Sequence, residues 1–328
     1  MKVGALGSFD GLDPDRWNAL VERASGGSVF LTWQWQTAWA AAFLNGRPLQ
    51  ILTVTDDDGV LHGALPLYED APGRWRIVGG EDVSDYLDAI AAPGAEPAVW
   101  EALLQHRASD RSTWELRGLR PDSATLSLAP ELGTVHGLTA VAEREERCPI
   151  LPLPATWDEY LARLSGKDRH ELRRKMRKLE AELPAVAVRS HTALDGWDEA
   201  MTAFLGLHRA SRTGKARFMD ERMEQFFRGA LRPLVAAGWA RLWFLESAAV
   251  PVASFLCVEY GPSVGLYNSK FDPSHARLAP GIVLLGHLIR DAIERAVPVF
   301  DFLRGEEPYK YAFGPTPRDL LRLRVAPA

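Results

Sequence analysis

Cysteine is scarce in this sequence, and long apolar runs are missing altogether. The 328 residues include two cysteines, Cys148 and Cys257, which lie far apart. Cys257 sits inside the mostly apolar run 253–258, so we predict buried, unreactive thiols in a reducing compartment rather than a disulfide. No stretch reaches the ~18 consecutive apolar residues of a membrane-spanning helix, and no basic start followed by an apolar run opens the chain. The sequence therefore predicts a cytoplasmic protein without a membrane span.

Signatures of several catalytic and cofactor-binding sites are also missing. The sequence contains no H-E-x-x-H, no paired C-x-x-C, no P-loop and no G-x-G-x-x-G. Its eight histidines are scattered without the spacing of metal ligands, so we predict no metal site. One G-x-S-x-G match, Gly261 to Gly265, lies between two strand-like runs, whereas serine hydrolases place this motif on a strand-to-helix elbow. We interpret the match as a hairpin turn.

An excess of positive charge is the third missing feature. Lys and Arg total 38 against 43 Asp and Glu, which gives a net charge of −5. This balance argues against wholesale nucleic-acid binding, because nucleic-acid-binding domains normally carry an overall positive charge. The hydrophobic content of 47% is that of an ordinary globular protein, and 328 residues suit two cores better than one.

The order of predicted strands, turns and helices is similar in the two halves of the chain. The corresponding elements are the hairpins 49–68 and 243–260, the strands 74–79 and 264–269, and the turns Pro93-Gly94 and Pro280-Gly281, each before a helix. We therefore predict an α+β protein, a tandem duplication of a mixed sheet flanked by helices. The proline-containing segment 149–154 places the boundary between domains 1–152 and 153–328.

Residues 277–310 are the most informative stretch of the chain. A turn at Ala279-Pro280-Gly281 passes into a helix whose apolar residues recur at a spacing of three and four, and a short apolar strand, 299–303, follows. A strand, a Pro-Gly turn and a helix are the parts of a site in which helix N–H groups face an anion. We therefore predict that this corner binds the charged end of a ligand through Arg277, Ala279, Pro280, Gly281 and Ile282.

A second distinctive segment is strongly basic. Residues 163–178 contain eight Lys or Arg against two acidic residues, Asp168 and Glu171. Leu172, Met176 and Leu179 form an apolar stripe, which predicts a helix. Two interpretations of the charges stay open: a solvated helix face, or a surface for a phosphate-bearing ligand or an acidic polymer.

Three of these segments together carry a family resemblance. The APG turn, the FDFLRGEEPYK sequence at 300–310 and the SGKDRHELRRKMRKLE helix at 165–180 resemble the GNAT acetyltransferases of the BioF2-like or CelD-like group, which are related to the Fem peptidyltransferases. The resemblance covers most of the chain. It implies two GNAT-like domains and an acyl-CoA donor such as acetyl-CoA. In ordinary GNAT enzymes the pyrophosphate of that donor sits on a longer arginine- and glycine-rich turn. In this sequence only Arg277 and Gly281 correspond to residues of that turn.

Polar residues at strand ends are the candidates for catalysis. Transfer of an acyl group from a thioester to an amine requires a base for the ammonium proton, a donor for the oxyanion and an acid for the departing thiolate. Asp85 and Glu306 follow corresponding strands of the two halves and are candidate bases, while Asp301, within a strand, is a weaker one. Tyr86 or Tyr309 could act as the acid.

Further residues are expected to hold the donor. In the Fem relatives a basic residue of this terminal region contacts the donor's phosphates, and the matching pair here is Tyr309-Lys310. Lys310 and Arg304 are therefore predicted to neutralise phosphates. Asn268 and Lys270, at the end of the strand before the APG turn, are predicted wall residues.

The sequence thus predicts an N-acyltransferase that moves an acyl group from coenzyme A to an amine, on a sugar or cell-envelope precursor. One alternative is a Fem-type transferase that uses aminoacyl-tRNA, which the basic helix favours, although segment 153–184 is too short for the long helical arm of the Fem proteins. The other alternative is a non-catalytic binding module. The sequence does not indicate which half contains the donor pocket.

Overall fold

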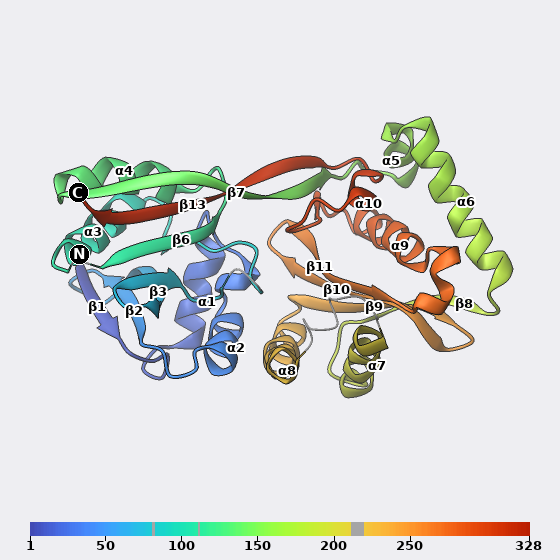
Figure 1. The fold of residues 1–328 in the computed structure, drawn as a ribbon, viewed down its shortest axis with the longest axis horizontal. Helices are drawn as coiled ribbons and strands as arrows, with labels where there is room; N and C mark the ends of the chain where they lie inside the picture. Colours follow the sequence, from blue (N-terminus) through green and yellow to red (C-terminus); the bar gives the residue numbers. More distant parts are fainter. Residues whose placement is uncertain (81–82, 111, 211–219) are drawn as a thin grey trace. The chain divides into compact units, whose positions relative to one another are not determined.

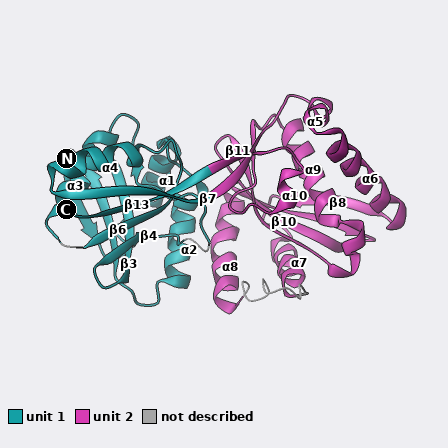
Figure 2. Cartoon of the chain, turned by 45° about the horizontal axis from the view of Figure 1, so that its top comes forward, with its two compact units in different colours: residues 1–146, 319–328 teal, residues 147–318 magenta. Residues whose placement is uncertain are grey.

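The computed structural model describes residues 1–80, 83–110, 112–210 and 220–328, which separate into two compact units (Figures 1 and 2). Unit 1 consists of residues 1–146 and 319–328, and unit 2 of residues 147–318. This division differs from the boundary at 152 mainly because the last ten residues of the chain group with the first half. In the described parts of the chain, every helix is too short or too polar to span a membrane.

Unit 1 is built on a sheet with the strand order β1-β2-β3-β4-β6-β13-β7, with β5 paired to β3. Its strands are β1 (Lys2–Leu6), β2 (Leu49–Thr55), β3 (Leu61–Ala71), β4 (Arg74–Ile77), β5 (Ile90–Ala91), β6 (Thr113–Leu119), the first part of β7 (Leu138–Pro152) and most of β13 (Thr316–Pro327). Its helices are α1 (Pro14–Arg23), α2 (Trp33–Phe43), α3 (Glu96–Ala108) and α4 (Ala124–Val135). The tryptophans at periodic positions, among them Trp17, Trp35 and Trp100, lie in its core.

Unit 2 continues from β7 through the strand order β12-β11-β10-β9-β8. Its strands are β8 (Val186–His191), β9 (Ala240–Ser247), β10 (Val250–Tyr260), β11 (Ser263–Phe271) and β12 (Val299–Asp301). Its helices are α5 (Trp157–Arg163), α6 (Gly166–Glu182), α7 (Trp197–Ala210), α8 (Glu221–Ala236), the 3-10 helix η3 (Pro273–Leu278), α9 (Pro280–Glu294) and α10 (Pro308–Tyr311). In Figure 1, α6 and α9 lie on one face of the sheet and α7 and α8 on the other.

The element order within each unit confirms the predicted duplicated α+β fold. In unit 1, β2, β3 and β4 are antiparallel, and β6 returns parallel to β4 after α3. In unit 2, β9, β10 and β11 are antiparallel, and β12 returns parallel to β11 after α9. In each unit the parallel strand then pairs with an antiparallel strand, β13 beside β6 and β7 beside β12. Each sheet is therefore mixed and flanked by helices.

Several local predictions are confirmed as well. The Gly261 to Gly265 segment joins β10 to β11 as a hairpin, with Tyr260 opposite Ser263. Helix α6 buries Leu172 and Leu179 against the core shared with α9, and its basic residues lie mostly at the surface. Cys148 and Cys257 are both buried and free, and burial raises the pKa of the Cys257 thiol.

Candidate active site

The two parallel strands of unit 2 diverge after a short paired stretch. β11 and β12 are in register from Ser263 opposite Val299 to Gly265 opposite Asp301, and β11 then continues to Phe271. The chain beyond β12 turns away through Leu303, whose φ of 54° lies in the left-handed region. The Leu303 N–H donates to Asp301 Oδ1 at 2.7 Å, which stabilises this turn. The register between β10 and β11 also shifts after Leu256, so that Tyr267 is an extra, bulged residue.

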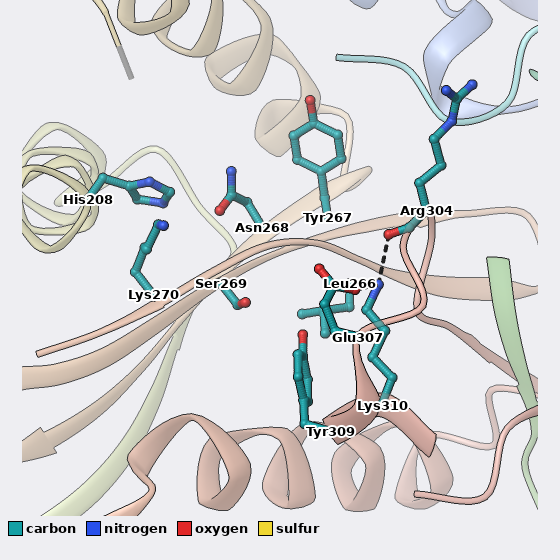
Figure 3. Close-up of a pocket in the computed structure, with 10 residues that line it drawn as sticks. All are labelled: His208, Leu266, Tyr267, Asn268, Ser269, Lys270, Arg304, Glu307, Tyr309 and Lys310. Atoms are coloured by element: carbon teal, nitrogen blue, oxygen red, sulfur yellow. Dashed lines mark hydrogen bonds and ion pairs between the residues drawn. The ribbon is translucent and has the colours of Figure 1, made fainter. Parts of the chain in front are cut away.

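A cavity of about 310 Å³ lies where the strands diverge (Figure 3). Residues 266–270 of β11 form one wall, and Arg304, Glu307, Tyr309 and Lys310 form the opposite wall. His208 of α7 lies at one end of the cavity beside Lys270. Of the residues predicted from the sequence, the cavity therefore brings together Asn268, Lys270, Arg304, Tyr309 and Lys310.

Tyr309 is a half-buried phenol on the short helix α10, where Pro308 occupies the first helical position. Burial raises the pKa of Tyr309 to about 12, the charge of Glu307 adds to this effect, and a hydrogen bond with Ser269 acts in the opposite direction. Its hydroxyl lies toward Ser269 in the cavity. The phenol is therefore protonated at neutral pH and available as a hydrogen-bond donor.

The ammonium group of Lys310 is fully engaged by contacts within the protein. Its Nζ donates to the carbonyl oxygens of Phe302, Arg304 and Gly305 at 3.0, 2.8 and 3.0 Å, and forms an ion pair with Glu307 at 2.9 Å. A lysine ammonium has three donors, so three carbonyls use all of them. The residue is only 4% exposed. Lys310 thus holds the 302–305 turn in place, and no N–H remains for the phosphate contact predicted from the sequence.

His208 is a residue that sequence reasoning missed. It is 1% exposed, its ring packs on Phe204 with the centroids 4.6 Å apart, and neither ring nitrogen has a hydrogen-bond partner among the described residues. Burial, followed by the positive charge of Lys270, lowers the pKa of His208 to about 3, so the imidazole is neutral. Metal-ligand spacing is a signal that a sequence gives for histidines in clusters, whereas no sequence signal marks a single buried imidazole.

The predicted carboxylates lie outside the cavity lining. Asp301 is 5% exposed, accepts the Leu303 N–H and lies 3.6 Å from an Arg318 nitrogen. Glu306 is exposed and accepts hydrogen bonds from the Tyr311 hydroxyl at 3.0 Å and from Arg147 at 3.4 Å. The neighbouring Glu307 lines the cavity instead. Because the chain reverses direction here, the sequence does not show which of two adjacent glutamates faces inward.

The Pro-Gly corner also lies outside the cavity lining. Ala279 adopts the left-handed conformation, with φ and ψ both 51°, and the Ile282 and Val283 N–H groups donate to its carbonyl at 3.0 and 3.2 Å. Two of the donors expected to face an anion are therefore already used. Gly281 packs near Phe271 and Phe255, and Arg277 forms an ion pair with Glu182.

Unit 1 contains the corresponding strand divergence, but its space is filled. β4 and β6 are paired from Arg74 to Arg76, and beyond this point the Leu87 N–H donates to the Gly118 carbonyl at 3.2 Å. The cavity here measures about 10 Å³, which is too small for more than one water molecule. Asp85 and Tyr86 belong to this filling segment, and Tyr86 is 7% exposed.

A second hollow in unit 1, of about 540 Å³, is larger than the cavity of unit 2. It lies across β4, β6, β7 and β13, and exposed side chains such as Val141, Glu143, Arg322 and Arg324 line it. Arg322 and Glu143 form an ion pair within it. It is a surface hollow on the strands, away from the point where β4 and β6 diverge. In the described ranges, no group of three or more His, Cys, Asp or Glu side chains is placed to hold a metal ion.

One family model and several solved structures are similar to this chain. The model of the GNAT acetyltransferase domain family matches residues 166–311. No curated protein matches the chain. Similar solved structures include a conserved protein of unknown function from Bacteroides thetaiotaomicron (TM-score 0.67, 11% identity, 99% of both chains), FemX (0.66, 12%, 97% of this chain and 96% of FemX) and L-PGS from Bacillus licheniformis (0.60, 12%, 95% and 91%).

At these identities, the solved structures show the fold alone. The family match and the shared fold confirm the resemblance to GNAT enzymes and their Fem relatives. The match covers α6, α7, α8, α9 and strands β8–β12, and so includes both walls of the cavity. Residues 166–311 of unit 2 thus match the GNAT acetyltransferase domain, and the chain resembles GNAT enzymes and their Fem relatives in fold.

Proposed function

We propose that unit 2 is an N-acyltransferase that moves an acyl group from acyl-CoA, with acetyl-CoA as the simplest donor, to an amine on a sugar or cell-envelope precursor in the cytoplasm. The observation that carries this proposal is the 310 Å³ cavity at the divergence of β11 and β12, within a GNAT domain. The cavity exposes a strand edge, a phenol and a carboxylate to one ligand-sized space.

The edge of β11 suits the donor. Beyond Gly265 its register with β12 ends, so backbone N–H and C=O groups of residues 266–270 can pair with an extended, amide-containing chain. The pantetheine arm of coenzyme A is such a chain. Lys270 and Arg304 add positive charge at the two ends of the cavity, which favours an anionic donor.

The side chains of the cavity suit acyl transfer. The amine attacks the thioester carbonyl, a C–N bond forms, the C–S bond breaks, and the ammonium proton passes to a base. Glu307 is the carboxylate that lines the cavity and is our candidate for this base. Tyr309, with a pKa of about 12, is a weaker acid than a thiol of about 8.5, so it stabilises the departing thiolate by hydrogen bonding while water supplies the proton.

Calorimetric titration with acetyl-CoA tests the proposal. We expect saturable heat for the wild-type protein, no heat for Ser269→Phe, which fills the cavity, and unchanged heat for Thr139→Phe, which fills the surface hollow of unit 1. The absence of heat at millimolar acetyl-CoA, in wild-type protein shown to be folded, would reject this donor.

The exposed basic residues of α6 favour a second candidate, a Fem-type transferase whose donor is aminoacyl-tRNA. Lys167, Arg173 and Arg177 lie exposed on this helix, and FemX shares the fold. This candidate predicts binding of charged tRNA that weakens steeply with salt, because phosphate contacts release counterions. The third possibility, a non-catalytic module, predicts that Glu307→Gln and Tyr309→Phe leave the function intact.

A further inference from the structure

His208 is buried in a way that packing alone does not explain. Its residue surface is 1% exposed, and both ring nitrogens lack hydrogen-bond partners among the described residues. A buried polar group without a partner costs stability, because it has lost its hydrogen bonds to water. A phenylalanine would make the same ring contact with Phe204 without this cost. The two nitrogens therefore point to a partner other than the described residues, and the ring lies at one end of the ligand-sized cavity.

The state of the ring restricts what that partner can be. A neutral imidazole has one N–H donor and one lone-pair acceptor, so a group that both donates and accepts satisfies both nitrogens. Burial and the nearby charge of Lys270 keep the ring neutral. The ammonium of Lys270 lies beside the ring, which disfavours a second cation at this end. A hydroxyl or an amide fits these conditions, and a bare amine does not.

We propose that His208 selects an acceptor substrate that carries a hydroxyl or primary amide group close to its reacting amine. This inference rests on the proposed acyl transfer in one respect, which is that the reacting amine lies in the same cavity, on the side of Tyr309 and Glu307. Amino sugars and amino-acid amides belong to this class of acceptor. Simple alkylamines do not, because they leave both ring nitrogens without partners.

Three small amines test the selection directly. Glycinamide carries an amide, ethanolamine carries a hydroxyl, and propylamine carries neither. We expect glycinamide and ethanolamine to shift the ring nitrogen-15 resonances of His208 in histidine-labelled protein, and propylamine to leave them unchanged. In acetyl transfer from acetyl-CoA, kcat/KM for ethanolamine should exceed that for propylamine roughly tenfold, the range of one to two neutral hydrogen bonds.

Two variants separate recognition from packing. His208→Phe keeps the ring contact with Phe204, and the resonances that it removes are those of His208. It should raise Tm by a few degrees, because it removes two buried nitrogens without partners. It should also abolish the preference for ethanolamine over propylamine. Ser254→Ala removes another orphan, a buried hydroxyl on β10 that lies outside the cavity lining. It should also raise Tm, while the preference among amines persists.

The outcomes distinguish this inference from the proposed function. If acetyl-CoA gives heat but none of the three amines shifts the His208 resonances, the inference is overturned and the proposed acyltransferase function stands. Shifts with glycinamide and ethanolamine but no heat with acetyl-CoA support the inference and reject that donor. A His208→Phe variant that retains the wild-type preference, or loses stability, also overturns it, because the ring would then be structural.

Discussion

The two units repeat one order of elements and differ in what occupies the space where their parallel strands diverge. In unit 2 this space is a cavity of about 310 Å³, whereas in unit 1 it measures about 10 Å³ (Figure 2 shows the two units). The difference lies in the segment that follows the strand. β11 runs on to Phe271 and then η3, whereas β4 ends at Ile77 and Leu87, hydrogen-bonded to Gly118, lines what remains of the gap.

The segment around Leu87 is well anchored in unit 1. Ser84 donates to the Gly79 carbonyl at 2.9 Å and accepts from Trp35 Nε1 at 2.8 Å, while Leu87 is buried and hydrogen-bonded to Gly118. In unit 2 the equivalent region is held open from the other side, because Lys310 fixes the 302–305 turn away from β11. A duplicated fold can thus retain its architecture in both copies and a ligand-sized cavity in one.

The largest expected effect comes from removing the anchor of each turn. Lys310→Met leaves three carbonyls without their donor and should lower the free energy of unfolding by about 3 kcal/mol. Leu87→Ala creates a void in unit 1 and should cost about as much, roughly 3 kcal/mol. Urea denaturation measures both. Only Lys310→Met should also weaken acetyl-CoA binding in the folded protein; equal weakening by Leu87→Ala would contradict the assignment of the site to unit 2.

A smaller effect is expected from the two candidate phenols. Tyr309→Phe keeps the ring and removes the hydroxyl beside Ser269, so kcat should fall about a hundredfold, as for loss of one preorganised donor. Tyr86→Phe, in the filled turn of unit 1, is the matched control and should leave kcat unchanged. Steady-state acetyl transfer to ethanolamine provides the measurement. The reverse pattern would move the reaction to unit 1.

The stability of the protein at acid pH tests the environment of His208. Its folded-state pKa of about 3 lies below the ordinary 6.5, so the unfolded chain binds more protons between these values and stability falls as pH decreases from 6.5 toward 3. His208→Phe should remove about 2 kcal/mol of the loss between pH 7 and pH 5. Denaturation curves at both pH values give the difference. Parallel losses in the two proteins would mean that His208 is not buried as a neutral ring.

The smallest effect is expected at the Pro-Gly corner. Arg277 is exposed and paired with Glu182, so Arg277→Ala should change the free energy of unfolding by less than about 1 kcal/mol. Because the corner lies outside the cavity lining, the Kd of acetyl-CoA should also change little. Calorimetry measures this Kd, and a tenfold increase for Arg277→Ala would indicate that the corner does bind the donor's phosphates.

Local patterns in the sequence predicted several elements of the fold, although not the terminal strands β1 and β13. The three-and-four spacing of apolar residues after Pro280 predicts α9, and the stripe from Leu172 to Leu179 predicts α6. The repeated order of hairpin, strand and helix predicts the duplication. The spacing of apolar residues reflects burial of one face of each helix or strand, and this spacing can be recognised from residues close together in the sequence.

The candidate site could be predicted only in part, for a physical reason. The wall residues Asn268 and Lys270 lie near the end of β11, where a sequence pattern places them, and Tyr309 lies in α10, in the segment that follows β12. The inward direction of Glu307 rather than Glu306 depends on the turn after β12, and the role of Lys310 depends on three carbonyls that approach it only in the folded chain.

By itself, the sequence determined the repeated order of strands and flanking helices in the two halves and the segment that borders the site. The tertiary structure alone decided which copy keeps an open space and which buried imidazole faces it. Element formation depends on contacts a few residues apart, whereas a cavity exists only where distant segments fail to fill the space between two diverging strands.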